Sequence, residues 1–312
     1  MKAIVVTDKA AGKAGMTLTG RPEPDAAKLA SLEGANYGDV IVEVHASGFT
    51  GNELEWPSTW VDRRGLDRTP VIPGHEVAGV VTALGYGTTG LSVGQRVFGI
   101  TDWTRDGTLA EYTVVEARNL APLPGDVDFT VGAGIAMTGL TAWQGLFEHA
   151  RLRQGQSVLV HGAAGAVGSM ASQLAREAGA YVIGTGRASG RRTALDFGVH
   201  EFVDLDNDSL EDIGAVDLVF DVIGGDIQKR STGLVRAGGT LVTVTGPPLA
   251  RPAAGLAIDF VVVSDRAQLG EVIQRVRDGR LRTNIGQISD LDDAVAALDR
   301  TVKGKTVIRV RS

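Results

Sequence analysis

A glycine-rich segment follows a short apolar run near the middle of the chain. The run at 158–161 predicts a strand, and the helical spacing of apolar residues over 167–178 predicts a helix after it. Glycines at such a junction let a ligand approach the backbone, where unpaired N–H groups and the helix dipole attract phosphate. The segment therefore predicts a dinucleotide pyrophosphate site, formed by Gly162, Ala163, Ala164, Gly165, Ala166, Val167 and Gly168.

One residue in this segment departs from the strictest form of the fingerprint. Ala163 stands where the first glycine is usual, which changes the turn slightly without preventing it. The alternative interpretation is a tight strand-to-helix turn that binds no ligand. A second predicted strand at 181–183 completes the βαβ unit that the fingerprint requires, and this favours a binding site.

Basic residues and hydroxyls follow the second strand of that unit. An NAD site usually has a carboxylate here, about 20 residues past the glycines, but the first acidic residue is Asp196. Guanidinium groups bind a 2′-phosphate, which a carboxylate would repel. The sequence therefore predicts NADPH rather than NADH, with Arg187 as the main contact; the alternative is a solvated helix start. The predicted contacts are Thr185, Gly186, Arg187, Ser189, Arg191 and Arg192.

Two regions of different pattern must position these residues. Up to about residue 120, short strands predicted at 40–44, 77–81 and 96–100 alternate with glycines, which indicates a small barrel-like domain. From residue 157 strands and helices alternate, which indicates parallel strands joined by right-handed crossovers. Further strands are predicted at 216–221, 240–244, 258–263 and 306–310, and helices at 191–197, 268–276 and 291–298.

Composition excludes several classes of protein. The 312 residues carry a net charge of -6, and this acidic balance argues against a nucleic-acid partner. The absence of cysteine excludes disulfides and thiolate metal sites. No apolar run is long enough to span a bilayer, and Asp8 comes too early for a signal peptide, so we expect no membrane partner and a cytoplasmic location.

Six segments together carry a family resemblance over essentially the whole length. They are Pro-Gly-His-Glu-Val-Ala-Gly-Val-Val at 73–81, Gly-Gln-Arg-Val-Phe-Gly at 94–99, Gly-Thr-Leu-Ala-Glu-Tyr at 107–112, Thr-Gly-Leu-Thr-Ala-Trp at 138–143, Ala-Ala-Gly-Ala-Val-Gly at 163–168 and Gly-Lys-Thr-Val at 304–307. In these segments the chain resembles the medium-chain dehydrogenase/reductase superfamily, specifically its zinc-free quinone oxidoreductase branch.

The resemblance implies an α/β fold with a GroES-like β-barrel catalytic domain and a Rossmann domain, a doubly wound parallel sheet that binds NADP. The expected limits are 1–123 for the first catalytic segment, 124–264 for the Rossmann domain and 265–312 for the returning catalytic segment. Many members dimerise through an edge strand of the Rossmann domain, so a homodimer is expected, with 258–263 as that strand.

Zinc-dependent members of the superfamily hold the metal with a Cys, a His and a second Cys. His75 stands at the His position, but Thr50 and Met137 stand at the Cys positions. Thr and Met are poor Zn²⁺ ligands, so no metal site is expected. His75 is interpreted as a structural hydrogen-bonding residue or as part of the pocket wall.

The resemblance also places the pocket and further cofactor contacts. Thr50 or Asn52 would donate a hydrogen bond to the acceptor, and Glu53 is favoured as an orienting or capping carboxylate over an acid. Trp56, Trp60 and Trp103 either wall the pocket or pack in the core. The further cofactor contacts implied are Thr138, Thr141, Val222, Ile223, Gly224, Thr245, Gly246, Phe260, Val261, Val262 and Lys305.

These interpretations predict an NADPH-dependent oxidoreductase that reduces a quinone or a small α,β-unsaturated carbonyl compound by hydride transfer without zinc. The first alternative is a tailoring enoyl reductase of a biosynthetic pathway. The second is a low-turnover NADPH-binding protein that acts as a redox sensor or a nucleic-acid-associated factor, and the acidic composition weighs against the nucleic-acid role.

Overall fold

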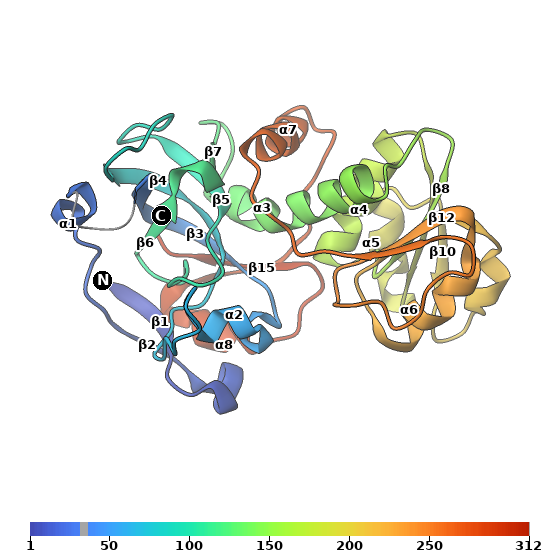
Figure 1. The fold of residues 1–312 in the computed structure, drawn as a ribbon, viewed down its shortest axis with the longest axis horizontal. Helices are drawn as coiled ribbons and strands as arrows, with labels where there is room; N and C mark the ends of the chain where they lie inside the picture. The colour runs from blue at the N-terminus through green and yellow to red at the C-terminus, as the bar shows by residue number, and fades with distance from the viewer. Residues whose placement is uncertain (32–36, 312) are drawn as a thin grey trace. The chain divides into compact units, whose positions relative to one another are not determined.

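The computed structural model describes residues 1–31 and 37–311, and these form two compact units (Figure 1). The first unit comprises Met1–Met137, Ser264–Arg277 and Ile285–Ser312, and the second comprises Thr138–Val263 and Asp278–Asn284. The domain limits expected from the sequence, 1–123, 124–264 and 265–312, stay a prediction.

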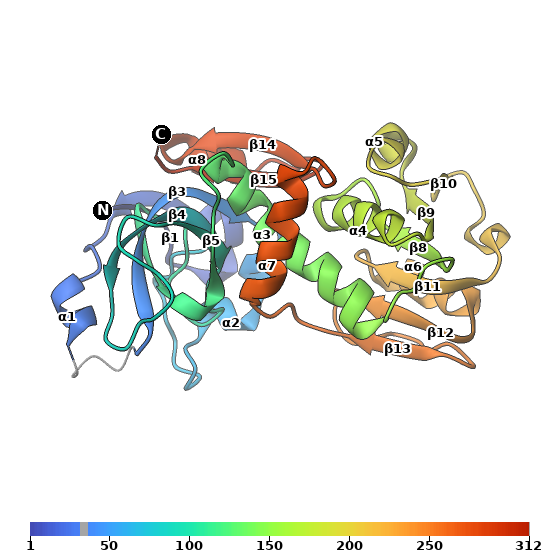
Figure 2. The same cartoon turned by 90° about the horizontal axis from the view of Figure 1, so that it is seen from above.

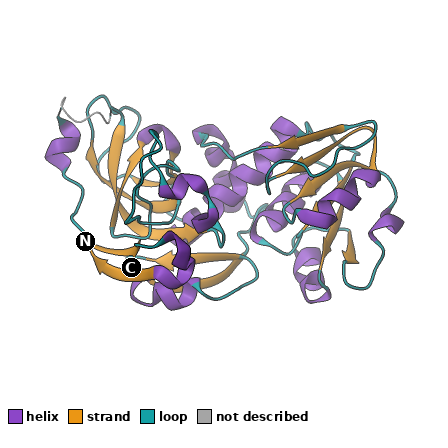
Figure 3. Ribbon diagram, turned by 60° about the horizontal axis from the view of Figure 1, so that its bottom comes forward, coloured by secondary structure: helices purple, strands orange, loops and turns teal. Residues whose placement is uncertain are grey.

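Strands dominate the first unit (Figure 3). Its strands are β1 (Lys2–Val6), β2 (Met16–Gly20), β3 (Asp39–Phe49), β4 (Glu76–Leu84), β5 (Arg96–Ile100), β6 (Tyr112–Glu116), β7 (Leu120–Pro122), β14 (Ile285–Asp290) and β15 (Lys305–Arg309). Its helices and helical turns are α1 (Ala26–Ala30), α2 (Pro57–Trp60), α7 (Arg266–Arg277), α8 (Ala294–Leu298), η1 (Lys9–Gly15), η2 (Glu53–Glu55), η3 (Ala117–Asn119) and η8 (Leu291–Asp293).

The main sheet of this unit has the order β14-β15-β3-β4-β5-β7, and β6 also pairs with β3. Val40, Val42 and Val44 alternate along β3 and share one face, because successive side chains of a strand point to opposite sides. They are buried in one cluster with Val77, on β4, and Val97, on β5. The valine alternation of the sequence therefore becomes the core of this sheet.

The returning C-terminal segment joins the same sheet. β15 pairs with β3 in antiparallel orientation, and Thr306 lies opposite Phe49. This register places Lys305 beside Thr50, although the two residues lie 255 positions apart in the chain. The pairing thus brings the last predicted strand to the segment predicted to carry the catalytic residues.

The second unit is a parallel sheet with helices. Its strands are β8 (Ser157–His161), β9 (Tyr181–Gly186), β10 (Glu201–Asp204), β11 (Val216–Asp221), β12 (Val235–Thr243) and β13 (Leu256–Asp259). Its helices and helical turns are α4 (Ala166–Glu177), α5 (Arg191–Asp196), α6 (Gly225–Ser231), η4 (Gln144–His149), η5 (Ala188–Gly190), η6 (Leu210–Ile213) and η7 (Thr232–Leu234). Helix α3 (Phe129–Trp143) contains the boundary between the two units.

The sheet has the order β10-β9-β8-β11-β12-β13, and every neighbouring pair is parallel. Helices α4 and α5 lie against the β8–β10 part of the sheet (Figure 2). The strand order reverses direction between β8 and β11, and ligands of open α/β sheets bind beyond the carboxyl ends of the strands at such a point. The predicted α/β class, with a β-rich domain and a Rossmann-like parallel sheet, is confirmed.

One predicted strand ends earlier than expected. The edge strand β13 is Leu256–Asp259, so the prediction of a strand at 258–263 was wrong over its last four residues. Val263 exchanges two hydrogen bonds with the side chain of Gln144, at 2.8 and 3.1 Å, instead of continuing the ladder with β12. Because a side chain satisfies this backbone, the β-branched composition of the segment does not produce a strand.

No helix among the described residues is long and apolar enough to cross a membrane.

Candidate functional site

The loops that follow three neighbouring strands, β8, β11 and β12, meet at the carboxyl edge of the parallel sheet. A Cβ on Gly162, after β8, would lie 2.8 Å from Val222, after β11. A Cβ on Gly224 would lie 2.6 Å from the hydroxyl of Thr245, after β12. These close approaches require glycine, and they bring the predicted cofactor segments into one cradle at the switch point of the sheet.

The glycine loop opens directly into α4. Gly165 is the N-cap residue, and no side chain among the described residues caps this end of the helix. The N–H groups of the first turn of a helix have no partner within the helix, so those of α4 are free to bind a ligand. A Cβ on Gly168 would lie 2.2 Å from the carbonyl oxygen of Gly162, so only glycine lets the helix start this close to the loop.

Asp221, at the end of β11, holds the next loop in place. Its buried carboxylate accepts hydrogen bonds from the N–H groups of Ile223 and Gly224, at 3.0 and 2.9 Å, and from the hydroxyl of Thr243 at 2.8 Å. All polar groups in this contact are therefore satisfied, and Asp221 fixes the loop rather than facing a ligand. Val222 is half-buried, and Ile223 is exposed at the cradle.

The three arginines predicted to bind the 2′-phosphate differ in their exposure and in their contacts with other side chains and carbonyl groups. The guanidinium of Arg187 is exposed, and no hydrogen bond or ion pair within the described residues engages it. Arg191 donates to the carbonyl of Phe202 at 3.1 Å and lies over its ring. Arg192 is 95% exposed and lies 3.9 Å from Asp196. Arg187 is thus the residue of the three that is most available to a ligand.

Sequence reasoning missed a carboxylate beside this loop. Asp204, at the end of β10, accepts a hydrogen bond from the N–H of Ala188 at 3.0 Å and from the side chain of Asn207 at 2.7 Å. The hydrogen bond from Asn207 is the main reason why the pKa of Asp204 is lowered. Both oxygens are engaged, so Asp204 shapes the loop and does not replace the acidic residue of an NAD site. The signal was its place at the end of the third strand.

Thr185 faces the interior of the sheet. Its hydroxyl lies 2.8 Å from Nδ1 of His161, and Nε2 of His161 lies 2.7 Å from the hydroxyl of Ser231. Burial lowers the pKa of His161 to about 4, although the negative charge of Asp221 opposes this shift. His161 is therefore a buried residue with both ring nitrogens hydrogen-bonded.

The other predicted cofactor residues of the second unit vary in exposure. Thr138, Thr141 and Val262 are buried, whereas Gly186, Gly246 and Phe260 are half-buried and Ser189 and Val261 are exposed. The ring of Phe260 lies 4.4 Å from that of His149. Asn284, which sequence reasoning missed, donates to the carbonyl oxygens of Ala164 and Gly165, at 3.0 and 3.4 Å. This asparagine holds the glycine loop from outside the βαβ unit.

In the first unit, Glu53 ties together the segment predicted to be catalytic. Its buried carboxylate accepts the N–H of Thr50 at 3.1 Å and the N–H of Gly74 in a short hydrogen bond. Burial raises the pKa of Glu53 to about 7, and the two backbone hydrogen bonds and Lys305 oppose the shift. Glu53 thus holds the backbone at Thr50 and Gly74, and its role in the reaction stays a prediction.

Beside it lies a buried ion pair. Lys305 pairs closely with Glu76 and donates to the hydroxyl of Thr50 at 3.0 Å. Glu76 also accepts the N–H of Met137 at 3.0 Å. The ammonium group of Lys305 is thus engaged within the first unit, and its predicted contact with the cofactor stays a prediction. Asn52 is exposed and starts η2 without a side-chain cap.

Two of the predicted pocket tryptophans cluster around His75. Trp56 stacks on the imidazole with ring centroids 5.9 Å apart, and Trp103 meets it edge to face at 5.0 Å. Burial, assisted by the charge of Arg68, lowers the pKa of His75 to about 3, so the ring is neutral. Trp60, by contrast, is buried in the core, where its indole N–H donates to the carbonyl of Leu54 at 2.8 Å.

Among the described residues, His75 has one hydrogen-bond partner, the hydroxyl of Thr101, which lies 3.3 Å from Nδ1. Within the described residues, no group of three or more His, Asp or Glu side chains is arranged to hold a metal ion. The ligand set that zinc prefers is therefore not assembled around His75.

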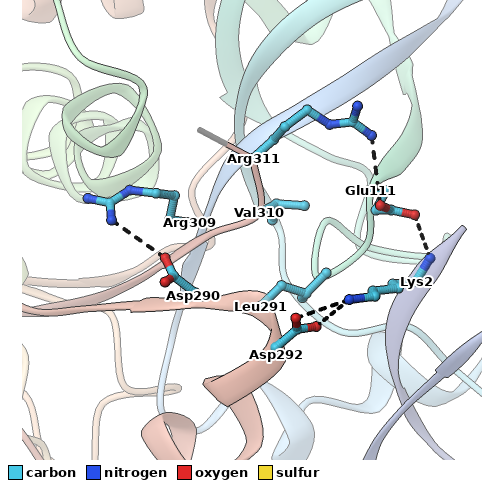
Figure 4. Close-up of a pocket in the computed structure, with 8 residues that line it drawn as sticks. All are labelled: Lys2, Glu111, Asp290, Leu291, Asp292, Arg309, Val310 and Arg311. Atoms are coloured by element: carbon cyan, nitrogen blue, oxygen red, sulfur yellow. Dashed lines mark hydrogen bonds and ion pairs between the residues drawn. The ribbon is translucent and has the colours of Figure 1, made fainter.

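A small hollow of about 140 Å³ lies elsewhere on the first unit (Figure 4). Lys2 and Asp292 form an ion pair across it at 2.7 Å, and Arg309 and Asp290 form another at 3.5 Å. Its charged side chains bind one another, as Figure 4 shows, and none of the predicted site residues lines it.

Comparison with known proteins places the chain in a family. Residues 36–125 match the model of the alcohol dehydrogenase GroES-like domain, and residues 197–308 match the model described as zinc-binding dehydrogenase. A quinone oxidoreductase of Rattus norvegicus is 34% identical over 214 residues, which are 66% of this chain and 64% of that protein. The chain thus spans less than two thirds of the length of this curated relative.

Two further proteins are similar over more of the chain. The spectinabilin polyketide synthase system protein NorB of Streptomyces orinoci is 33% identical over 290 residues, which are 86% of this chain and 13% of NorB. A mycobacterial protein whose structure was solved in complex with NADPH is 25% identical, covers 99% of this chain and 100% of its own, and superimposes with a TM-score of 0.82.

The fold and these similarities define the class: the chain belongs to the medium-chain dehydrogenase/reductase superfamily. Within the superfamily it belongs to the quinone oxidoreductase-like branch. The resemblance read from the sequence motifs is confirmed.

Proposed function

We propose that this protein is an NADPH-dependent oxidoreductase that reduces a quinone or a small α,β-unsaturated carbonyl compound without zinc. One observation carries the proposal: the uncapped N-terminus of α4 lies within a cradle of loops that only glycine at 162, 168 and 224 permits. Free N–H groups and the helix dipole at such a place suit a pyrophosphate. When bound, NADPH supplies a hydride from its nicotinamide ring.

The choice of NADPH over NADH rests on the loop after β9. Arg187 extends an unengaged guanidinium from this loop, and the nearby carboxylate of Asp204 already binds Ala188 and Asn207. A guanidinium group stabilises the 2′-phosphate of NADPH, whereas NADH offers it only a hydroxyl. The NADPH complex of the mycobacterial relative supports the same choice.

The acceptor site that we propose belongs to the first unit. Thr50 presents a hydroxyl there, and Trp56 and Trp103 provide aromatic surface around His75. Aromatic faces suit the flat, conjugated ring of a quinone or the plane of an enone. The names of the curated relatives, quinone oxidoreductases, support this class of acceptor.

The test is a mixture of the purified protein with NADPH or NADH and a panel of quinones and enones, followed at the absorbance of the reduced nicotinamide. We expect NADPH to be oxidised with simple quinones or small enones, and NADH to be oxidised more slowly. Absence of oxidation with every acceptor, despite NADPH binding, would refute the reductase and support a cofactor-binding sensor.

A tailoring enoyl reductase is the second candidate. The similarity to NorB, a polyketide synthase system protein, extends over 86% of this chain, more than the similarity to the rat quinone oxidoreductase. The same panel separates the two candidates when it includes thioester-linked enones. Oxidation of NADPH with these bulky substrates alone would favour the biosynthetic enzyme.

We propose that the reaction needs no zinc because Thr50 and Met137 occupy the positions of the two cysteine ligands, and oxygen and thioether donors of this kind hold Zn²⁺ poorly. Prolonged dialysis against a chelator should leave kcat unchanged, and metal analysis should find less than one zinc per chain. Loss of activity that added zinc restores would contradict this part of the proposal.

A further inference from the structure

A buried cation stands behind the hydroxyl of Thr50. Lys305, on β15, is buried and forms a close ion pair with the buried carboxylate of Glu76, on β4. A second N–H of the same ammonium group donates to Oγ1 of Thr50 at 3.0 Å. Thr50 itself is half-buried, so it is the one member of this trio with surface open to a ligand.

The contacts of Glu76 fix the positions of both oxygens of its carboxylate, and through them the position of Lys305. The N–H of Met137 donates to Oε1 at 3.0 Å, and Lys305 pairs with Oε2. A Cβ on Gly48 would lie 2.7 Å from Oε2, so glycine at this position makes room for the carboxylate. Glu76 therefore holds Lys305 in one place, and Lys305 can direct another of its three N–H donors at Thr50.

The hydrogen bond from Lys305 determines where the hydroxyl proton of Thr50 points. An ammonium group only donates, so Oγ1 of Thr50 must accept from Lys305 and must give its own proton to another atom. The acceptor that the described residues offer is the thioether sulfur of Met137, at 3.5 Å. Because a thioether is a weak acceptor, this hydroxyl is a polarised donor without a good partner.

The peptide N–H of Thr50 is engaged by Glu53, which accepts it at 3.1 Å. The backbone is thus fixed on one side by Glu53 and the side chain on the other by Lys305. A donor held in this way does not need to reorient when negative charge develops near it, so little free energy is lost to reorganisation. This is the condition for effective stabilisation of an oxyanion.

We propose that Thr50 donates the hydrogen bond that stabilises the oxygen of the acceptor, and that Lys305, held by Glu76, is the residue that positions and polarises this hydroxyl. The inference rests on the proposed function. As a hydride adds to the quinone or enone, the electron pair of the conjugated carbonyl moves onto its oxygen. Thr50 stabilises that charge and keeps its proton, and a proton from water completes the hydroquinone or the saturated carbonyl, with NADP⁺ as the other product.

The first experiment replaces Thr50. Thr50→Val removes the hydroxyl at nearly equal volume, and Thr50→Ser keeps it. We expect Thr50→Val to lower kcat about 100-fold, the loss typical of one oxyanion donor, with little change in the Kd for NADPH. Thr50→Ser should recover most of kcat. Thr82→Val, on β4, is the matched control, because the hydroxyl of Thr82 donates to the carbonyl of Ile41 at 3.3 Å and to no other group in the described part of the chain.

The second experiment tests Lys305 without leaving a buried charge. The double variant Lys305→Met with Glu76→Gln removes the ion pair and keeps an acceptor for the N–H of Met137. We expect a fall in kcat of at least 10-fold and little further loss when Thr50→Val is added, because both changes remove the same polarised hydroxyl. A double variant that melts like the wild type and retains its kcat, or effects that multiply in full, would overturn the inference.

A third measurement does not depend on turnover. p-Nitrophenol, bound to the full-length protein with NADP⁺, changes its visible absorbance when it ionises, so titration gives the pKa of the bound phenol. We expect wild type and Thr50→Ser to lower this pKa by about one unit or more, as a charge-assisted donor near the oxygen would, and Thr50→Val to abolish the shift.

These measurements separate the inference from the proposed function. Quinone reduction by the wild type together with an unchanged kcat and phenol pKa in Thr50→Val would overturn the inference alone. A different combination is a wild type that shifts the pKa of the bound phenol, loses this shift in Thr50→Val, and fails to oxidise NADPH with every acceptor of the panel. That combination would support the inference and refute the reductase. No shift in the wild type would count against the inference.

Discussion

Burial shifts the pKa of several ionisable side chains, upward for one carboxylate and downward for two imidazoles. Glu53 has a pKa raised to about 7 and still uses its carboxylate to hold two backbone N–H groups. His161 and His75 have pKa values lowered to about 4 and about 3, so both rings are neutral at physiological pH. Arg187, in contrast, is exposed where a phosphate is expected.

Glu53 should make stability depend on pH. Its pKa rises from 4.5 in the unfolded chain to about 7 in the folded one, so the folded state binds the proton more tightly. Between these values the unfolded chain loses its proton first, and the free energy of unfolding falls as pH rises, by up to about 3 kcal/mol. Urea unfolding from pH 5 to 8 should show this slope in the wild type and in the exposed control Glu55→Gln, but not in Glu53→Gln. Equal slopes in all three proteins would contradict the assignment.

Arg187→Ala should weaken NADPH binding and leave NADH binding almost unchanged. A hydrogen bond between two charged groups contributes about 1.5–3 kcal/mol, so we expect the Kd for NADPH to rise about 10- to 100-fold. Fluorescence titration with both cofactors measures this. Arg153→Ala is the control, since Arg153 is exposed and precedes β8, at the opposite end of the strand. An unchanged Kd for NADPH in Arg187→Ala would remove this residue from the site.

At the scale of elements, the glycine loop is shaped from outside as well as by its own sequence. The segment 278–284 belongs to the second unit, although the residues before and after it belong to the first. Asn284 bonds to the carbonyls of Ala164 and Gly165, and Gln173, on α4, exchanges two hydrogen bonds with Arg282 at 2.9 and 3.0 Å. Both side chains hold the segment, but only Asn284 touches the loop.

This difference makes a matched pair of variants. Asn284→Ala loses two hydrogen bonds, and Gln173→Ala loses three, the third being to the carbonyl of Ser169 on the same helix. Each variant should destabilise the protein by about 1–2 kcal/mol. We expect Asn284→Ala alone to raise the Kd for NADPH, about 3- to 10-fold, because the loop carbonyls lose their anchor. Calorimetry gives both quantities. Equal cofactor affinity in the two variants would show that Asn284 has no role in the binding loop.

At the scale of the whole molecule, the parallel sheet ends in an exposed edge. Among the strands that the structure describes, β13 pairs with β12 alone, and Leu256 on β13 is 62% exposed. A free strand edge with apolar side chains favours pairing with another chain. We therefore expect a homodimer joined through β13, as the family resemblance implied, although over Leu256–Asp259 rather than 258–263.

Leu256→Glu should shift this protein toward the monomer. In a two-fold dimer the substitution places like charges from both copies at one interface, beside Asp259, and removes apolar contact area. Leu249→Glu is the control, because Leu249 is equally exposed, at 66%, but lies outside the strand. Light scattering after gel filtration gives the mass of each variant. A dimer that persists in Leu256→Glu would exclude β13 as the interface.

Much of the fold was predictable from local patterns. The strands β3, β4, β5, β8, β11 and β15 and the helices α4 and α7 were expected at nearly their observed positions. Helix α3 was missed because Ile135, Ala136, Leu140 and Ala142 are all buried, and a helix that is apolar on several sides shows no amphipathic period. The end of β13 was misplaced because its successor segment bonds to Gln144, a contact 119 residues away in sequence.

The amino-acid sequence by itself determined the class of this protein, because its motifs are local. The strand, glycine turn and helix of the binding loop lie in one short segment, so their geometry is recognisable without the rest of the fold. Only the tertiary structure decided which side chains are available for chemistry. Thr185 turns inward to His161, Trp60 packs in the core, and Lys305 binds Glu76 and Thr50. The physical reason is that burial and hydrogen-bond partners come from residues far apart in the chain, which no local pattern records.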